Sequence, residues 1–150
     1  MQSEYQLKAP ETEEEYRKYY EFRYNLLRKP WDQPVGSEKD EMEDQSFHRM
    51  IVDKDGIVVG VGRLHFNTEK ESQIRYLAVN ENIRNQGFGS KIVAELEKIA
   101  QEKGAKEVML VSREGALDFY ARRGYRITKD AKTLFGTIKH KEMRKVLVAA

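Results

Sequence analysis

A glycine-rich segment in the middle of the chain, residues 84–90, has the residue types that hold a phosphate group. Glycine has no Cβ, so at Gly87 and Gly89 the backbone can turn tightly and bring its N–H groups close to a ligand. A helix-forming run, residues 90–103, follows at once, and the first N–H groups of a helix lack intrahelical partners and attract anions. Arg84 adds a fixed positive charge. These features predict a site for a ligand that carries phosphate.

The glycine spacing excludes two common nucleotide-binding motifs. A P-loop requires G-x-x-x-x-G-K-[ST], whereas Gly89 is followed by Ser90 and then Lys91, in the reverse order. A dinucleotide-binding turn requires G-x-G-x-x-G directly after a strand, but Ile92 stands at the third glycine position and residues 80–86 separate the loop from the preceding strand. The pattern that remains is R-x-x-G-x-G.

Two further motifs follow the glycine loop. The pattern A-x-x-F-Y-x-x-x-G-[FY] is formed by Ala116, Phe119, Tyr120, Gly124 and Tyr125. Near the end of the chain, the pattern H-x-x-M-x-K is formed by His140, Met143 and Lys145. Together with the loop, these motifs resemble those of the GNAT superfamily of acyl-CoA N-acyltransferases, in particular its small single-domain bacterial members. The resemblance covers residues 50–147.

The resemblance implies an acetyl-CoA-dependent N-acetyltransferase that needs no metal and acts on a primary amine, either a small molecule or a group on a peptide or protein. The chain has no Cys and no plausible Ser-His triad, so we expect direct attack in a ternary complex and no acyl-enzyme. The residues expected to bind acetyl-CoA are Leu77, Ala78 and Val79, by a backbone N–H group, and Arg84, Asn85, Gln86, Gly87, Phe88, Gly89, Ser90 and Arg113.

The resemblance implies that Tyr120 lies beside the sulfur of CoA and is the general acid, since a phenol with a pKa of about 10 stays protonated at neutral pH and can donate to the departing thiolate. An aromatic side chain that only packs on an amphipathic helix is the alternative. The expected general base is His140. His65, Glu71 and a water relay to a surface carboxylate are alternatives. Gln73, which aligns with a carboxylate base of some relatives, cannot take a proton.

The acceptor is expected to lie beside the first helix and the loop that follows it, lined by Arg23, Tyr24, Arg28 and Trp31. A solvated helix face with one packed Trp is the alternative. Arg113 stands where many family members have an Asn that contacts the pantetheine arm. Three roles are open for it: contact with the 3′-phosphate, binding of a substrate carboxylate, or solvation. The acidic run of residues 40–44 either attracts an amine or is plain surface.

Composition limits the remaining function classes. A length of 150 residues suits one domain spanning residues 1–150. A net charge of +2 gives no reason to expect nucleic acid as a partner, and the absence of Cys excludes disulfides and thiolate metal sites. The N-terminus lacks the pattern of a signal peptide, and no apolar run reaches the length of a membrane span. We therefore expect a cytoplasmic protein without membrane contact, for which a homodimer is an allowed assembly.

The element pattern predicts an α/β fold with a mixed central sheet and helices on both faces, and the resemblance implies that this fold is of GNAT type with a mostly antiparallel sheet. A capping box at Thr12 starts the first helix, Gly104 ends the helix after the loop, and a short helix carries Tyr120. A second short helix is expected near residues 38–44. Strands are expected at residues 5–9, 47–52, 57–66, 74–79, 105–111 and 135–145, with a hairpin turn at 53–56.

Two rival functions follow from the same residues. A non-catalytic acyl-CoA-binding or sensing module would keep the loop but lack a base, which agrees with Gln73. A nucleotide-binding regulator would use the loop for a different phosphate. The acceptor itself is left open among polyamines, amino acids, antibiotics, peptide N-termini and protein lysines.

Overall fold

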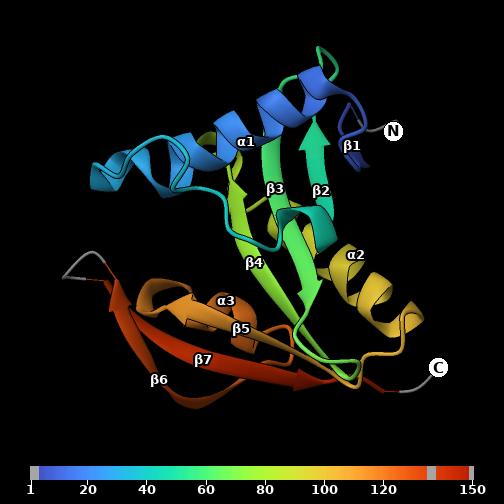
Figure 1. Ribbon diagram of the computed structural model, residues 1–150, viewed down its shortest axis with the longest axis vertical. Helices are drawn as coiled ribbons and strands as arrows, with labels where there is room; N and C mark the ends of the chain where they lie inside the picture. Colours follow the sequence, from blue (N-terminus) through green and yellow to red (C-terminus); the bar gives the residue numbers. More distant parts are fainter. Residues whose placement is uncertain (1–3, 135–137, 149–150) are drawn as a thin grey trace.

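The computed structural model describes residues 4–134 and 138–148, which form a mixed α/β fold around one central sheet (Figure 1). The helices are α1 Glu13–Leu27, α2 Phe88–Glu102 and α3 Leu117–Ala121, with short 3-10 turns at Lys29–Trp31, Glu43–Gln45, Glu81–Ile83 and Glu114–Ala116. The strands are β1 Gln6–Lys8, β2 Phe47–Val52, β3 Val58–Phe66, β4 Glu71–Val79, β5 Glu107–Arg113, β6 Arg126–Leu134 and β7 Ile138–Val146.

The sheet has the strand order β1-β2-β3-β4-β5-β7-β6, and within the described ranges every neighbouring pair except β4–β5 is antiparallel. The mixed, mostly antiparallel sheet predicted from the sequence is therefore confirmed. The hairpin between β2 and β3 also forms, because Gly56 takes a positive φ of 79° and the carboxylate of Asp53 accepts the N–H groups of Asp55 and Ile57.

Helices cover both faces of the sheet, as predicted. On one face α2 buries Ile92, Val93 and Leu96 against the sheet, and a Cβ added to Gly62 on β3 would lie 2.5 Å from the Ile92 side chain. On the other face α1 packs through Tyr19, and Figure 1 shows it crossing in front of β2, β3 and β4. The glycine on β3 thus sets how closely α2 approaches the sheet.

The first turn of α1 follows the sequence prediction in part. Thr12 caps the helix, with its Oγ1 accepting the N–H of Glu15 at 3.1 Å. The Glu15 carboxylate accepts from the N–H of Glu11 at 2.8 Å, where a full capping box would place the N–H of Thr12. The helix start is thus correct, but the reciprocal bond is shifted by one residue.

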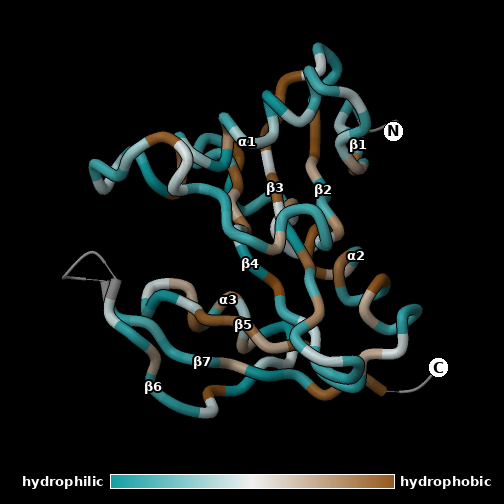
Figure 2. Tube along the Cα trace, in the orientation of Figure 1, coloured by the Kyte–Doolittle hydropathy of each residue, from teal (hydrophilic) through white to brown (hydrophobic). Residues whose placement is uncertain are grey.

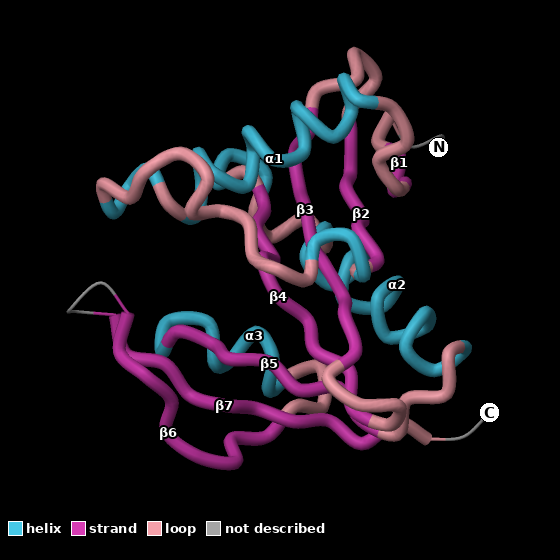
Figure 3. Tube along the Cα trace, in the orientation of Figure 1, coloured by secondary structure: helices cyan, strands magenta, loops and turns pink. Residues whose placement is uncertain are grey.

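The parallel pair β4–β5 is short. Its register runs only from Glu71 and Glu107 to Gln73 and Met109, and Figures 1 and 3 show the two strands diverging beyond that point. The second halves of β4 and β5 therefore present backbone groups that are not paired with each other. This parting is the feature of the fold that positions the candidate site.

Several predicted elements differ from the structure. β6 was not predicted, since its sequence is mostly polar, and Figure 2 shows both β6 and β7 as largely hydrophilic. The expected helix at residues 38–44 is only the 3-10 turn Glu43–Gln45. β5 begins and ends two residues later than expected, and α2 begins two residues earlier. Residues 135–137 of the predicted closing strand lie outside the described residues.

Candidate active site

The N-terminus of α2 offers free backbone N–H groups. Gly87 is the N-cap residue with φ 83°, and no side chain caps the helix. The first intrahelical bond to the cap runs from the N–H of Lys91 to the carbonyl of Gly87 at 3.0 Å, so the N–H groups of Phe88, Gly89 and Ser90 precede the hydrogen-bond ladder. A Cβ at Gly87 would meet nothing within 4 Å. The open space and the unshared donors fit a phosphate.

The two glycines of the loop have different roles. Gly87 holds the left-handed turn in front of open space. A Cβ at Gly89 would lie 3.0 Å from the ring of Phe119, so this glycine lets α3 pack against the start of α2. The sequence interpretation assigned both glycines to the approach of a ligand, and for Gly89 the structure adds a packing constraint.

The remaining loop residues divide between solvent and core. Arg84, Asn85 and Gln86 are exposed, and Asn85 takes a positive φ of 72°. The Arg84 Nε donates to the carbonyl of Val79 at 3.3 Å, which places this side chain over the end of β4. The Phe88 side chain is buried in the core, so only its backbone is available to a ligand.

Sequence reasoning missed Arg123, which joins α3 to the loop. Its guanidinium donates to the Ser90 hydroxyl and to the Phe119 carbonyl, and it stacks 3.7 Å above the Phe119 ring. Burial and the charge of Arg122 lower the pKa of Arg123 below its usual range. Arg123 directly precedes Gly124, which has the expected positive φ of 93°. Its place inside the motif of Tyr120 and Gly124 was the available signal that it lies near the site.

A bulge in β4 lies at the start of the predicted cofactor-binding strand. Arg75 pairs with Arg63 and Ala78 pairs with Val61, so Tyr76 and Leu77 together oppose a single residue of β3. Tyr76 has a φ of 60°, which is rare for a residue with a bulky side chain. The strand is therefore kinked where it parts from β5.

The orientation of the backbone beyond the bulge follows from one bond. The N–H of Asn80 donates to Val59 on β3 at 2.8 Å. Because N–H groups alternate between the two edges of a strand, the N–H groups of Val79 and Leu77 point to the opposite edge, toward β5. The side chain of Ala78 packs on the α1 side, whereas Leu77 and Val79 pack with the α2 core.

Tyr120 lies on α3 and packs against the core on the α2 face of the sheet. Its ring contacts Phe119 and Tyr125 at centroid distances of 5.0 and 5.9 Å. Burial raises the pKa of Tyr120 to about 12, against the opposing charges of Arg113 and Arg123. The phenol is therefore protonated at neutral pH, as a general acid requires.

His140 lies on the other face. β5 and β7 pair in an unbroken register, with Leu110 opposite Met143 and Arg113 opposite His140. Met143 is buried in the α2 core, so strand alternation puts His140 and its exposed neighbour Arg113 on the opposite face from Tyr120. The expected acid and base thus start from opposite faces of the sheet, although the charge of Arg113 at the end of β5 still reaches Tyr120.

Two alternative bases have pKa values below their usual range. The Arg63 guanidinium donates to His65 Nδ1 at 2.9 Å, so the His65 Nε2–H donates to Asn67 at 3.0 Å. Burial, and then the Arg63 charge, lowers the pKa of His65. Glu71 accepts from Arg144 and Asn67, which lowers its pKa. A lowered pKa makes either group a weak base at neutral pH.

The four residues expected to line the acceptor site are not equivalent. Arg23 is fully buried and donates to Glu43, Glu38 and Tyr19, so it is not open to a substrate. The Tyr24 hydroxyl donates to the Gln33 carbonyl at 2.8 Å. Arg28 is half-buried and Trp31 is exposed. The expectation for Arg23 is therefore corrected.

Two acids of the run at residues 40–44, Asp40 and Glu43, are ion-paired, whereas Glu41 and Asp44 are exposed. The Asp40 carboxylate binds Arg63 through two hydrogen bonds and Arg75 through one of 2.7 Å. The Glu43 carboxylate binds Arg23 and Arg63 at 2.9 and 2.8 Å. Both acids are thus paired with arginines, of which sequence reasoning had included only Arg23, and they are not available to attract an amine.

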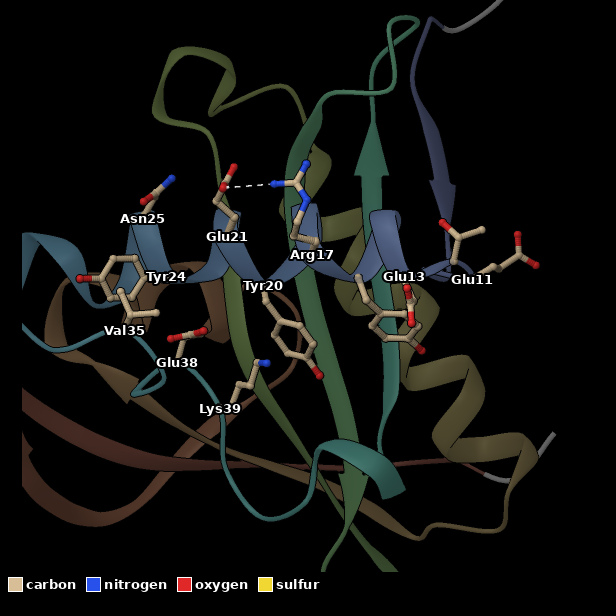
Figure 4. A pocket seen from close by; sticks show the side chains of 12 residues that line it. Glu11, Glu13, Arg17, Tyr20, Glu21, Tyr24, Asn25, Val35, Glu38 and Lys39 are labelled. Atoms are coloured by element: carbon tan, nitrogen blue, oxygen red, sulfur yellow. Dashed lines mark ion pairs between the residues drawn. The ribbon is translucent and has the colours of Figure 1, made fainter.

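A separate hollow of about 770 Å³ runs along the outer side of α1 (Figure 4). Tyr16, Tyr20 and Tyr24 line it from the helix, and Lys39 lies 4.3 Å above the Tyr20 ring. Its lining includes neither the loop of residues 84–90 nor Tyr120. Within the described ranges, no helix is long and apolar enough to cross a membrane, and no three His, Cys, Asp or Glu side chains are grouped to hold a metal ion.

Comparisons with known proteins agree with this fold. The chain is 29% identical over 134 residues to the uncharacterized N-acetyltransferase YjcF of Bacillus subtilis, covering 89% of this chain and 94% of that protein. Its fold is similar to an aminoglycoside 6'-N-acetyltransferase complexed with coenzyme A, at a TM-score of 0.79, 16% identity and coverage of 97% and 98%. It is also similar to a GNAT family acetyltransferase from Elizabethkingia anophelis with acetyl-CoA bound, at a TM-score of 0.71, 16% identity and coverage of 97% and 100%.

A sequence model described as the acetyltransferase (GNAT) family matches residues 5–125, which is most of the chain. The match includes β4, the glycine loop, α2 and the Tyr120 motif. The chain therefore belongs to the GNAT family of acetyltransferases.

Proposed function

We propose that this N-acetyltransferase transfers the acetyl group of acetyl-CoA directly to a primary amine. One observation carries the proposal: the free N–H end of α2 lies beside the edge of β4 that has parted from β5. The Val79 side chain is 3.9 Å from the Cβ position that Gly89 lacks, so the phosphate-binding corner and the kinked strand adjoin. Solved relatives with this fold hold coenzyme A or acetyl-CoA.

The residues present fit acetyl-CoA. The N–H groups of Phe88, Gly89 and Ser90, with the charge of Arg84, would hold its phosphates in the open space before Gly87. The N–H groups of Leu77 and Val79 point to the parted edge, where they would donate to the acetyl oxygen. Acetyl-CoA supplies an acyl group activated as a thioester.

Proton transfers at the two faces complete the proposed reaction. The amine nitrogen forms a bond to the acetyl carbon, the carbon–sulfur bond breaks, and the negative charge on the oxygen is stabilised by backbone donors. Tyr120, on the α2 face, gives its proton to the departing sulfur. The amine loses a proton on the other face, to His140 or through water. In this proposal Tyr120 acts at the departing sulfur, and His140 or water acts at the attacking nitrogen.

The competing function is an acyl-CoA-binding module without turnover. It is favoured by Gln73 at the position of a carboxylate base and by the lowered pKa values of His65 and Glu71. The two functions are separated by thiol release from acetyl-CoA with a panel of amines, with mass spectrometry of the products. We expect amine-dependent thiol release and an amide product. Binding of acetyl-CoA without faster release for any amine would favour the module.

A further inference from the structure

Four arginine side chains surround the ring of Tyr76, at the bulge of β4. The guanidinium carbons of Arg23, Arg75, Arg63 and Arg28 lie 4.1, 4.6, 5.0 and 5.6 Å from the ring centroid. They come from α1, its C-cap, β3 and β4, so the tertiary fold assembles them. Tyr76 itself is 7% exposed and takes the strained φ of 60°. We call these five residues the arginine cluster.

Two carboxylates bind three arginines of the cluster. Asp40 and Glu43 are ion-paired to Arg23, Arg63 and Arg75. Two carboxylates against these three guanidinium groups leave an excess of positive charge around one aromatic ring. Arg23 and Arg63 are fully buried by this network and have structural roles.

The two outer arginines differ from the buried pair. The Arg75 side chain is 43% exposed, and its hydrogen bonding among the described residues is a single bond from Nη1 to Asp40. Arg28 is half-buried, with Nε donating to the Ser37 carbonyl and Nη1 to the Leu27 carbonyl, each at 3.0 Å. Burial, and then the charges of Arg75 and Arg23, lower the pKa of Arg28. An anion beside Arg75 and Arg28 would relieve this repulsion.

The cluster lies on the face from which the amine would approach. Arg75 is the register partner of Arg63, whose carboxylate partners come from the segment that covers the α1 face of the sheet. α2 and Tyr120 occupy the other face. The cluster also adjoins Leu77 in sequence, the residue whose N–H points to the parted edge of β4. An anionic group held here would lie on the same face of the sheet as the approaching amine.

We propose, on the basis of the proposed function, that Arg75 together with Arg28 binds a carboxylate of the acceptor, so that the preferred acceptor is a small amine that also carries a carboxylate group. Guanidinium groups suit this task because they bind carboxylates through paired hydrogen bonds. The cluster determines specificity and does not take part in proton transfer. Arg23 and Arg63, which are ion-paired to Asp40 and Glu43, hold the ring of Tyr76 in place. The two outer arginines pack against that ring.

The experiment compares amino acids with their own amides as acceptors. Glycine, β-alanine and 4-aminobutyrate are each assayed beside the matching carboxamide, in the parent protein and in Arg75→Gln. The Arg49→Gln variant is the matched control, because Arg49 is also a partly exposed strand arginine with one carboxylate partner, Glu95 at 2.9 Å, on the α2 face. Isothermal calorimetry with acetyl-CoA confirms that each variant is folded and binds the co-substrate.

We expect Arg75→Gln to lower kcat/KM by about 10- to 100-fold for at least one amino acid, which is the effect of losing a charged hydrogen bond, and to change its carboxamide little. Arg49→Gln should change neither. Because each amide is compared with itself, the different amine basicities of acid and amide cancel. Equal losses for acids and amides in Arg75→Gln, or amides preferred in every pair by the parent protein, would overturn the proposal. Turnover of amines that lack a carboxylate would in that case still support the acetyltransferase, whereas no turnover of any amine would reject the proposed function itself.

Discussion

At the scale of single residues, the loop shows that one residue type can serve two purposes. Gly87 and Gly89 are both required by the R-x-x-G-x-G pattern, but Gly87 faces open space at φ 83° and Gly89 faces Phe119. Gly104, at the other end of α2, has φ 92° and also faces open space. A substitution at Gly104 therefore measures the cost of a Cβ in the left-handed region without changing the candidate binding site.

Gly87→Ala and Gly104→Ala should destabilise the fold to a similar extent, by roughly 1–2 kcal/mol, because each places a Cβ in the left-handed region. Only Gly87→Ala should also weaken acetyl-CoA binding, since its methyl group enters the space before the N–H groups of α2. Urea unfolding and calorimetry measure the two effects. Equal acetyl-CoA affinity in both variants would remove Gly87 from the binding site.

Tyr120→Phe tests the general acid. Removing one hydroxyl should lower kcat by roughly ten- to ten-thousandfold with little change in acetyl-CoA affinity. Tyr125→Phe is the control, since its hydroxyl donates to Glu97 at 2.8 Å and should affect stability more than kcat. If chemistry limits the rate and kcat is unchanged in Tyr120→Phe, then Tyr120 has no part in the reaction.

At the scale of elements, the contact between α2 and β3 depends on a missing side chain. Gly62→Ala would place a Cβ 2.5 Å from Cγ2 of Ile92, which is fully buried and branched at Cβ. We expect a loss of stability of about 1–3 kcal/mol from overpacking, measured by urea unfolding. Full stability in Gly62→Ala would mean that α2 can move away from the sheet without penalty.

The sequence predicted those elements whose local signals agree with their tertiary environment. The apolar face of α2, the hairpin at Gly56 and the turn after α3 at Gly124 all formed as expected, because periodicity and glycine conformations are local properties. β6 was missed because it is an edge strand with a polar sequence, so no alternation marks it. The bulge at Tyr76 was missed because it depends on pairing with β3, which is a long-range contact.

The candidate site follows the same division. The loop residues and Tyr120 are recognisable from the sequence because short motifs contain them. The arginine cluster is not, since its members come from α1, β3 and β4 and only the fold brings them together. His140 was identified from a motif, but its face of the sheet became clear only from the register of β5 and β7.

At the scale of the whole molecule, buried polar groups predict how stability depends on pH. Burial, and for His65 also Arg63, lowers the pKa values of His48 and His65 in the folded state, so the unfolded chain binds more protons below a pH of about 6.5. Burial would raise the pKa of Asp40, but hydrogen bonds from Arg63 and Met42 outweigh it and hold that pKa well below its usual range. Protonation of Asp40 in the unfolded chain therefore removes further stability below a pH of about 4.

We therefore expect the free energy of unfolding to fall in two stages as the pH is lowered, first through the histidine range and then through the carboxylate range. Urea unfolding followed by circular dichroism at a series of pH values measures this profile. A free energy of unfolding that is constant from neutral pH to a pH of about 4 would show that the two histidines are not held neutral in the fold.

The central claim, that acetyl-CoA binds between the N-terminus of α2 and the parted edge of β4, is tested most directly by following backbone amide signals in NMR spectra during an acetyl-CoA titration. The account predicts saturable shifts at one-to-one binding for Leu77, Val79, Phe88, Gly89 and Ser90. Unchanged signals at these five residues, with shifts confined to the hollow beside α1, would contradict it.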